Sequence, residues 1–252
     1  MADTVLRTIG KYAITDSDVV RDMRTTFALE PQIRGAAIRM LVFDYCKQKN
    51  ITVTDDELQK EADAWRVHHG LFRASDTVKF LETFSISIDD FERELEFRQL
   101  LRKLKDALFG KKVKGWFLEH QSNFDEVELR HLVVKDQSTC QELRDQIVDD
   151  RVPFEKLAKQ HSLDVTSKRK GGYLGWVRRG SNIPEYEAEI FGAKPVTVLG
   201  PFKVPAGYEL VQVLDTAKAK FNDDIQEEIL DHLLDEEFIV KHLPVPKVEA
   251  PG

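Results

Sequence analysis

The sequence predicts an α+β protein, with helices over the first half, then a compact segment of strands and helices, then one further helix. Apolar residues recur at helical spacing from about residue 16 to residue 123. From Val127 the pattern changes to alternating runs rich in β-branched residues, separated by short helical runs. With 252 residues, 42% hydrophobic and 32% charged, the chain has the composition of a globular protein long enough for two domains.

Charge and cysteine content exclude several functional classes. A formal net charge of -7 argues against a general nucleic-acid binder or a protein that binds anionic membranes. The first residues, MADTVLRTIGKYAITDSD, hold no apolar run as long as a signal peptide or a membrane helix needs. We therefore expect a cytoplasmic protein without membrane insertion, or an extracytoplasmic one if a signal has been removed. Cys46 and Cys140 lie far apart, so no disulfide framework is expected.

Two helices open the first half. Asp16 or Ser17 can cap a helix whose apolar positions are Val19, Val20, Met23 and Phe27. Pro31 then opens a second helix, with apolar positions at Ile33, Ala37, Ile38, Leu41, Val42 and Tyr45. The two apolar faces predict that these helices pack together.

Two more helices follow. Thr54 with Glu57 three residues later forms a capping box, and Gly70 marks the end of that helix. The run SISIDDFERELEFRQLLRKLKDAL then predicts a long helix, with Phe91, Leu95, Leu101, Leu104 and Leu108 on one face. The piece VKGWFLEHQSNF closes the helical half.

The second segment mixes strands and helices. VELRHLVV predicts a strand over about 127–134, and CQELRDQIVDD, PFEKLAKQHS and PEYEAEIF predict helices. KVPAGYELVQVLDTA has strand character around a Pro-Ala-Gly turn. A last amphipathic helix covers 221–243, and the proline-rich tail PVPKVEAPG is expected to be disordered. The expected domains are 1–126, 127–217, and 218–252 as a C-terminal helix with its tail.

Metal, cofactor and nucleophile sites are not predicted. His68 and His69 are adjacent on a helix, so their side chains point about 100° apart, which suits a metal poorly. Neither cysteine, nor any serine motif, has an identifiable neighbouring base. GGYLG lacks the lysine and the spacing of a phosphate-binding loop.

The order of segments in the second half carries a resemblance. VELRHLVVK, PFEKLAKQHSLD, GGYLGWVRRG, PEYEAEIF and GPFKVPAGYELVQV together resemble the parvulin family of peptidyl-prolyl cis-trans isomerases over residues 127–217. The phrases TDDEL and ISIDDFERELEFRQLL resemble the helical chaperone module of bacterial foldases such as SurA and PrsA. The resemblance implies a four-stranded antiparallel sheet with flanking helices, and a C-terminal helix that returns to the N-terminal module.

The resemblance also implies a site. His131 matches the first histidine of the family's polar network. The family's second histidine is replaced by Glu209, and the acidic or cysteine position near the amide falls either on Asp164 or on Val165. The resemblance implies that the proline pocket is formed by Leu174, Asn182 or Ile183, Tyr186 and Phe191. Tyr186 stands where the family usually has Phe, and core packing is an alternative role for Leu174.

Two features around Leu174 stand out in the sequence itself. The pair Gly171 and Gly172 predicts a tight turn into a short strand, where a Cβ would clash or φ must be positive. Five cations bracket the same strand, namely Lys168, Arg169, Lys170, Arg178 and Arg179. They form either an ordinary solvated loop or a rim that favours acidic residues near the proline.

The predicted function is a peptidyl-prolyl isomerase and folding chaperone that acts on unfolded, proline-containing segments without a cofactor. Glu209 and the ambiguity at Val165 keep one alternative open. In that alternative the chain is a catalytically weak holdase or substrate escort with a degenerate parvulin domain. The client and the oligomeric state are not predicted.

Overall fold

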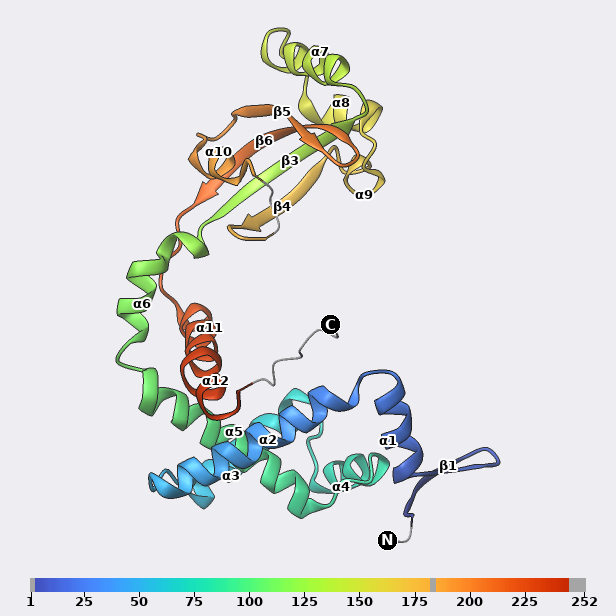
Figure 1. Cartoon of the computed structure of the whole chain (residues 1–252), viewed down its shortest axis with the longest axis vertical. Coiled ribbons are helices and arrows are strands. Elements are labelled where there is room, and N and C mark those ends of the chain that lie inside the picture. Colours follow the sequence, from blue (N-terminus) through green and yellow to red (C-terminus); the bar gives the residue numbers. More distant parts are fainter. Residues whose placement is uncertain (1–2, 182–184, 245–252) are drawn as a thin grey trace, which may run out of the picture. The chain divides into compact units, whose positions relative to one another are not determined.

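The structure, a computed structural model, describes residues 3–181 and 185–244 (Figure 1). Its contacts divide the chain into two compact units, one of Met1–Val113 with Asp224–Gly252 and one of Lys114–Asp223. We call them the helical unit and the sheet unit. The sheet unit extends beyond the expected 127–217 because helix α6, Val113–His120, packs within it. The Phe117 ring lies 5.4 Å from the Phe221 ring, and the Gln121 side chain donates to the Ala219 carbonyl at 2.7 Å.

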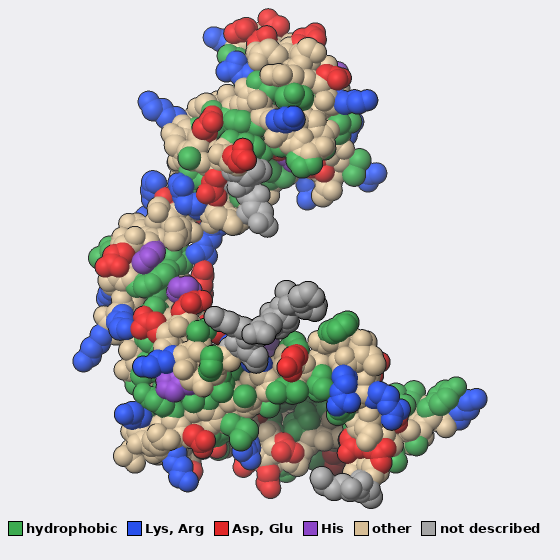
Figure 2. Space-filling model, viewed as in Figure 1, with side chains coloured by type: hydrophobic (Ala, Val, Ile, Leu, Met, Phe, Trp, Pro, Cys, Tyr) green, Lys and Arg blue, Asp and Glu red, His purple; other side chains and the backbone are tan. Residues whose placement is uncertain are grey.

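The helical unit begins with a hairpin that the sequence did not predict. Strands β1, Val5–Ile9, and β2, Tyr12–Thr15, pair antiparallel, and their apolar side chains are largely exposed (Figures 1 and 2). The helices are α1, Asp16–Thr25; α2, Leu29–Gln48; α3, Asp55–His68; α4, Ala74–Thr83; and α5, Ile88–Phe109. Helix α4 is a further element that sequence analysis did not assign.

Local capping signals set two of the helix starts. The capping box predicted at Thr54 and Glu57 is confirmed at the start of α3. For α1, the predicted cap at Asp16 or Ser17 is wrong by one or two residues. Thr15 is the N-cap, and its side chain and that of Asp18 each accept a hydrogen bond from the other's backbone N–H. Thr15 also ends β2, so one residue closes the hairpin and opens the helix.

The C-terminal segment packs on the helical unit. It comprises α11, Asp223–Leu233; a π-helical stretch η2, Leu234–Ile239; and the short α12, Val240–His242. The buried Lys105 of α5 pairs with Glu227 and Asp231 of α11, and the Phe238 ring meets the Tyr45 ring edge-on at 4.8 Å. The apolar faces at both ends of the chain therefore cover each other.

The described part of the chain holds no helix long and apolar enough to span a membrane. The cytoplasmic location stays a prediction, and the tail 245–252 lies outside the described residues. Acidic and basic side chains are interspersed over the visible face of each unit (Figure 2). Both cysteines are free and buried.

The sheet unit is a four-stranded antiparallel sheet with helices on both faces. The strands are β3, Glu126–Val134; β4, Tyr173–Arg178; β5, Val198–Val204; and β6, Gly207–Ala217, in the order β4-β3-β6-β5. The connections hold η1, Gln121–Phe124; α7, Gln137–Val148; α8, Phe154–His161; α9, Val165–Lys168; and α10, Glu187–Gly192. The predicted α+β class, with a four-stranded antiparallel sheet and flanking helices, is confirmed. The prediction that the N-terminal module is all-helical is wrong, because β1 and β2 pair as a hairpin before α1.

Alternation along β3 separates the two faces of the sheet. Leu132 and Val134 point to one face, where residues of α7 and α8 cover them. Val127 and Leu129 point to the other, where they pack with Tyr186 and with Ile190 of α10. His131 follows Leu129 by two residues, so it lies on the α10 face.

Candidate active site on the α10 face of the sheet

His131 is the centre of a polar network. Its Nδ1 lies 2.5 Å from Oε1 of Glu209, and its Nε2 lies 3.0 Å from Oδ2 of Asp164 and 2.9 Å from Oγ of Ser167. The His131 side chain is only 14% exposed. The structure thus brings together the three residues predicted as catalytic, which are 78 positions apart at their widest.

Strand register places Glu209 beside His131. His131 pairs with Val211 and Val133 pairs with Glu209, so His131 and Glu209 are diagonal neighbours on one face of adjacent strands. Asp164 is positioned by a helix start rather than by strand register. It is the N-cap of the short helix α9 and accepts hydrogen bonds from the backbone N–H groups of Thr166 and Ser167.

The structure separates the two alternatives for the acidic position. Asp164 contacts His131, whereas Val165 is 77% exposed. The Ser167 hydroxyl also donates to Asp164 at 2.5 Å, so Asp164 is held from both its own helix and from β3.

Aromatic side chains border the polar network. The Tyr186 hydroxyl donates to the second carboxylate oxygen of Glu209, and its ring stacks on the Phe202 ring with centroids 3.9 Å apart. Phe191 packs against the same apolar cluster. Two of the predicted pocket residues, Tyr186 and Phe191, therefore belong to one apolar surface that meets Glu209.

The remaining predicted pocket residues fall outside this cluster. Leu174 lies on the edge strand β4, is 44% exposed and belongs to neither core cluster of the sheet unit, so core packing does not account for it. Asn182 and Ile183 lie outside the described residues.

The five cations divide into two groups. Arg178 donates to the Asn123 carbonyl at 3.0 Å and lies over the Phe124 ring, while Arg179 lies over the Phe191 ring at 4.3 Å. These two are partly buried by aromatic packing. Lys168, Arg169 and Lys170 end α9 and form the loop before β4, and Arg169 and Lys170 are exposed. The exposed positive charge is therefore concentrated on that loop.

The paired glycines let this loop press against β3. Gly171 and Gly172 have φ values of +67° and +80°. A Cβ on Gly172 would lie 2.0 Å from the His131 carbonyl oxygen, and the Gly172 carbonyl accepts from the His131 N–H at 2.8 Å. A Cβ on Gly171 would lie 2.6 Å from Cβ of Glu155. Gly172 thus lies directly against the His131 backbone, and Gly171 lies against Glu155 of α8.

Electrostatics favour a charged histidine between two carboxylates. Burial opposes the charge, but the hydrogen bonds and charges of Glu209 and Asp164 outweigh it and raise the pKa of His131 above 6.5. The hydrogen bond from Ser167, joined by that from His131, lowers the pKa of Asp164 well below its usual range. Burial and the hydrogen bond to Glu209 raise the pKa of Tyr186 far above its usual value. The Tyr186 hydroxyl therefore stays protonated at neutral pH and donates its hydrogen bond to Glu209.

The buried thiol near this network is chemically inert. Burial, with the charge of Glu209, raises the pKa of Cys140 to about 11. A protonated thiol is a poor nucleophile, so the site offers no covalent chemistry through Cys140.

Replacing Glu209 by Gln is expected to lower the pKa of His131, because the hydrogen bond that His131 donates to Glu209 is the largest cause that raises this pKa. A raised pKa contributes stability below the unfolded pKa of 6.5, and that contribution is lost as the pH rises through the folded pKa. The wild type should therefore exceed Glu209→Gln in stability by more at about pH 5.5 than at about pH 8.5. NMR titration of the imidazole and denaturant unfolding at both pH values measure this. Glu142→Gln, at an exposed carboxylate of α7, is the control and should change neither the pKa of His131 nor the pH dependence of stability. A pH-independent difference would contradict the assignment.

Two residues of this site were missed from the sequence. Ser167 could have been found, because Asp164 followed three residues later by Ser167 is a local capping pattern. Phe202 had no local signal. Its place opposite Glu209 follows only from the pairing of β5 with β6.

The chain is similar to several known proteins. Residues 134–215 match the rotamase family, described as the PPIC-type PPIase domain. Foldase protein PrsA 2 of Bacillus cereus is 26% identical over 228 residues, which cover 88% of this chain and 74% of that protein. Foldase protein PrsA of Caldanaerobacter subterraneus is 26% identical over 211 residues, 83% of this chain and 64% of the relative.

A solved structure is also similar. The peptidylprolyl isomerase PrsA of Bacillus anthracis is 26% identical and covers 80% of this chain and 88% of its own, with a TM-score of 0.44.

Proposed function

We propose that this chain, which carries a parvulin-type rotamase domain beside a helical module of the PrsA and SurA kind, is a peptidyl-prolyl isomerase and folding chaperone. Its sheet unit accelerates the cis–trans isomerisation of X-Pro bonds, and its helical unit holds unfolded segments. The observation that carries the proposal is the contact between the apolar cluster of Tyr186, Phe191 and Phe202 and the hydrogen-bonded network of His131, Glu209 and Asp164.

This arrangement suits a reaction in which no bond breaks. Rotation about an X-Pro bond is opposed by amide resonance, with a barrier of about 18–20 kcal/mol. An apolar surface that grips the proline ring lets the amide twist away from water, and fixed polar groups then stabilise the twisted form. His131 and its two carboxylates are held by hydrogen bonds before the substrate arrives, so they need no reorganisation.

The catalytically weak alternative is not favoured. Glu209 replaces the second histidine that the resemblance implies, yet it still holds Nδ1 of His131 and also binds Tyr186. The network is therefore continuous across the substituted position. The relatives that match most of the chain are named foldases, which supports the isomerase and chaperone over a substrate escort.

The charge around the site adds a substrate preference. Arg169 and Lys170 are exposed in the loop that leads into β4, which carries Leu174. A peptide with an acidic residue next to its proline gains from these cations, and salt screens that gain.

Leu174→Ala tests the proposed function. Because the Leu174 side chain is half exposed, its loss should change stability by less than about 0.5 kcal/mol. It should lower kcat/KM for a proline tetrapeptide about tenfold, since the missing carbons no longer cover the proline ring. Val148→Ala, at an exposed valine at the end of α7, is the matched control and should keep full activity. Equal activity of both variants would show that Leu174 does not contact the substrate. If the wild-type protein does not accelerate isomerisation of the tetrapeptide, the proposed isomerase function is wrong.

A further inference from the structure

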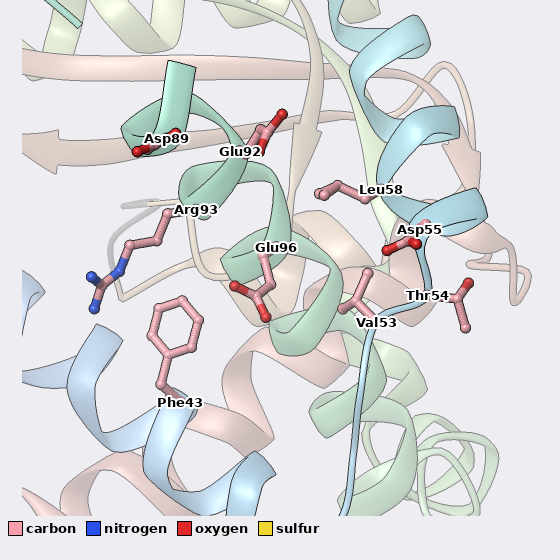
Figure 3. Close-up of a pocket in the computed structure, with 9 residues that line it drawn as sticks. All are labelled: Phe43, Val53, Thr54, Asp55, Leu58, Asp89, Glu92, Arg93 and Glu96. Atoms are coloured by element: carbon pink, nitrogen blue, oxygen red, sulfur yellow. The ribbon is translucent and has the colours of Figure 1, made fainter. Parts of the chain in front are cut away.

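Helices α3 and α5 line two adjoining cavities within the helical unit, of about 560 and 450 Å³. Phe43 of α2 also lines the first cavity, and residues of α4 line the second. The two cavities share Asp55, Leu58 and Glu92, so they form one continuous depression, which we call the α3–α5 groove; Figure 3 shows its first part. The lining of its second part is largely apolar, with Leu58, Val78, Leu81, Ile88, Phe91 and Leu95. Leu81 and Leu95 are buried, whereas Val78 and Ile88 are exposed. Cavities of this size accommodate several side chains of a ligand.

A buried hydroxyl in the groove has no partner. Thr77 of α4 is only 8% exposed and lines the second cavity, and its Oγ1 is buried without a hydrogen-bond partner. Buried polar atoms are almost always paired, because an unpaired one loses its bonds to water without replacement. Because Thr77 lines the second cavity while its Oγ1 is covered, a turn of the side chain toward the cavity would let the N–H and C=O groups of a bound peptide backbone satisfy this hydroxyl.

The rim of the groove is acidic. Asp55, Asp89, Glu92 and Glu96 line the first cavity, and within residues 3–181 and 185–244 none of the four takes part in an ion pair. Figure 3 shows Glu92 and Glu96 projecting from α5, and Asp55 at the start of α3.

The cations at the groove do not neutralise this rim. Arg66 is paired with Asp63, which does not line the groove, and the charge of Arg93, which lies over the Phe43 ring, offsets only one of the four carboxylates. The uncompensated charge is therefore negative and attracts a cationic ligand.

We propose that the α3–α5 groove binds an extended client segment whose apolar side chains are flanked by lysine or arginine. The apolar side chains enter the two cavities, the segment's backbone bonds to Thr77, and its cations meet Asp55 and Glu92. This inference rests on the proposed function, because it names the class of segment that the helical unit holds.

The test uses the full chain and two proline-free probes, so that the rotamase site is not engaged. The probes are fluorescein-labelled Lys-Lys-Leu-Val-Ile-Leu-Lys-Lys and its counterpart with glutamate in place of lysine. Fluorescence anisotropy at low salt should show at least about tenfold tighter binding of the lysine probe, and the difference should shrink at high salt. Equal affinity for both probes would overturn the proposal.

Variants assign the binding to the groove. Asp55→Asn and Glu92→Gln should each weaken the lysine probe by about threefold, as expected for single exposed charges. Asp56→Asn and Glu82→Gln each remove an exposed carboxylate that does not line the groove. They should leave the affinity for the lysine probe unchanged. Thr77→Val keeps the side-chain shape, so it should weaken binding about fivefold without lowering the Tm. Unchanged binding in Thr77→Val, or equal loss in the control variants, would count against the groove.

Two further readouts separate the possible failures. If groove variants alter the sedimentation coefficient while probe binding stays intact, a second copy of the chain covers the groove and the proposal fails. Isomerisation of the proline tetrapeptide should be unaffected by the groove variants. If the groove variants bind the probe normally, the proposed isomerase activity is not affected. If the chain does not isomerise the tetrapeptide, the result of the probe-binding experiment still holds.

Discussion

Gly172→Ala is expected to destabilise the sheet unit by roughly 3 kcal/mol or more, the largest effect of any single substitution at this site. Two costs combine at this position. The residue has φ of +80°, and its new Cβ would lie 2.0 Å from the His131 carbonyl oxygen, a separation that only a backbone shift can relieve. That shift would move β3 at His131, so isomerase activity should fall with stability.

Gly180→Ala separates these two costs. Its φ is +81°, nearly the same, but a Cβ there meets nothing within 4 Å. Only the conformational cost of about 1–2 kcal/mol applies. Denaturant unfolding of the two variants, followed by tryptophan fluorescence, gives the contact cost as the difference. Equal destabilisation would show that the loop does not press on β3 as the structure places it.

Removing both partners of Lys105 is expected to destabilise the helical unit by about 3 kcal/mol. The Lys105 side chain is 5% exposed and pairs with Glu227 and Asp231 of α11. Burial opposes its charge, but the two carboxylates raise its pKa above the usual 10.5, so it is charged at neutral pH. Glu227→Ala with Asp231→Ala leaves that buried charge without a partner.

Lys105→Met provides the matched test of this explanation. A buried ion pair can be replaced by an apolar side chain of similar volume at little cost. Lys105→Met alone should therefore be nearly neutral, and adding it to the double variant should restore most of the lost stability. Circular dichroism during thermal unfolding measures all three. If Lys105→Met is as damaging as the double variant, the charge is not the cause.

Much of the local structure was predictable because its causes lie within a few residues. The capping box at Thr54 and Glu57 and the alternation along β3 are short-range patterns. The long helix α5 was also predictable, but its buried face includes Leu100 and Phe109, whereas the predicted Leu101 and Leu108 are only half-buried. The elements that were missed have weaker local signals. The β1–β2 hairpin has little buried apolar surface, and α4 buries only Thr77 and Leu81.

Of the candidate site, the sequence indicated which residues to examine but not which of them meet. His131, Asp164, Glu209 and Tyr186 were all named from the sequence. Val165 competed with Asp164 until the turn into α9 placed Asp164 against His131 and left Val165 exposed. Leu174 was as compatible with a core position as with a pocket wall, and burial distinguishes the two.

By itself the sequence determined the class of fold, the position of most helices and strands, and the need for two glycines before β4, because these follow from periodicity and from backbone sterics. Only the tertiary structure decided that Glu209 bonds both His131 and Tyr186, that Phe202 stacks on Tyr186, and that Lys105 is buried. Each of these depends on the register of two strands or the packing of two helices far apart in the chain. Such contacts arise from the burial of whole faces, and no local pattern encodes them.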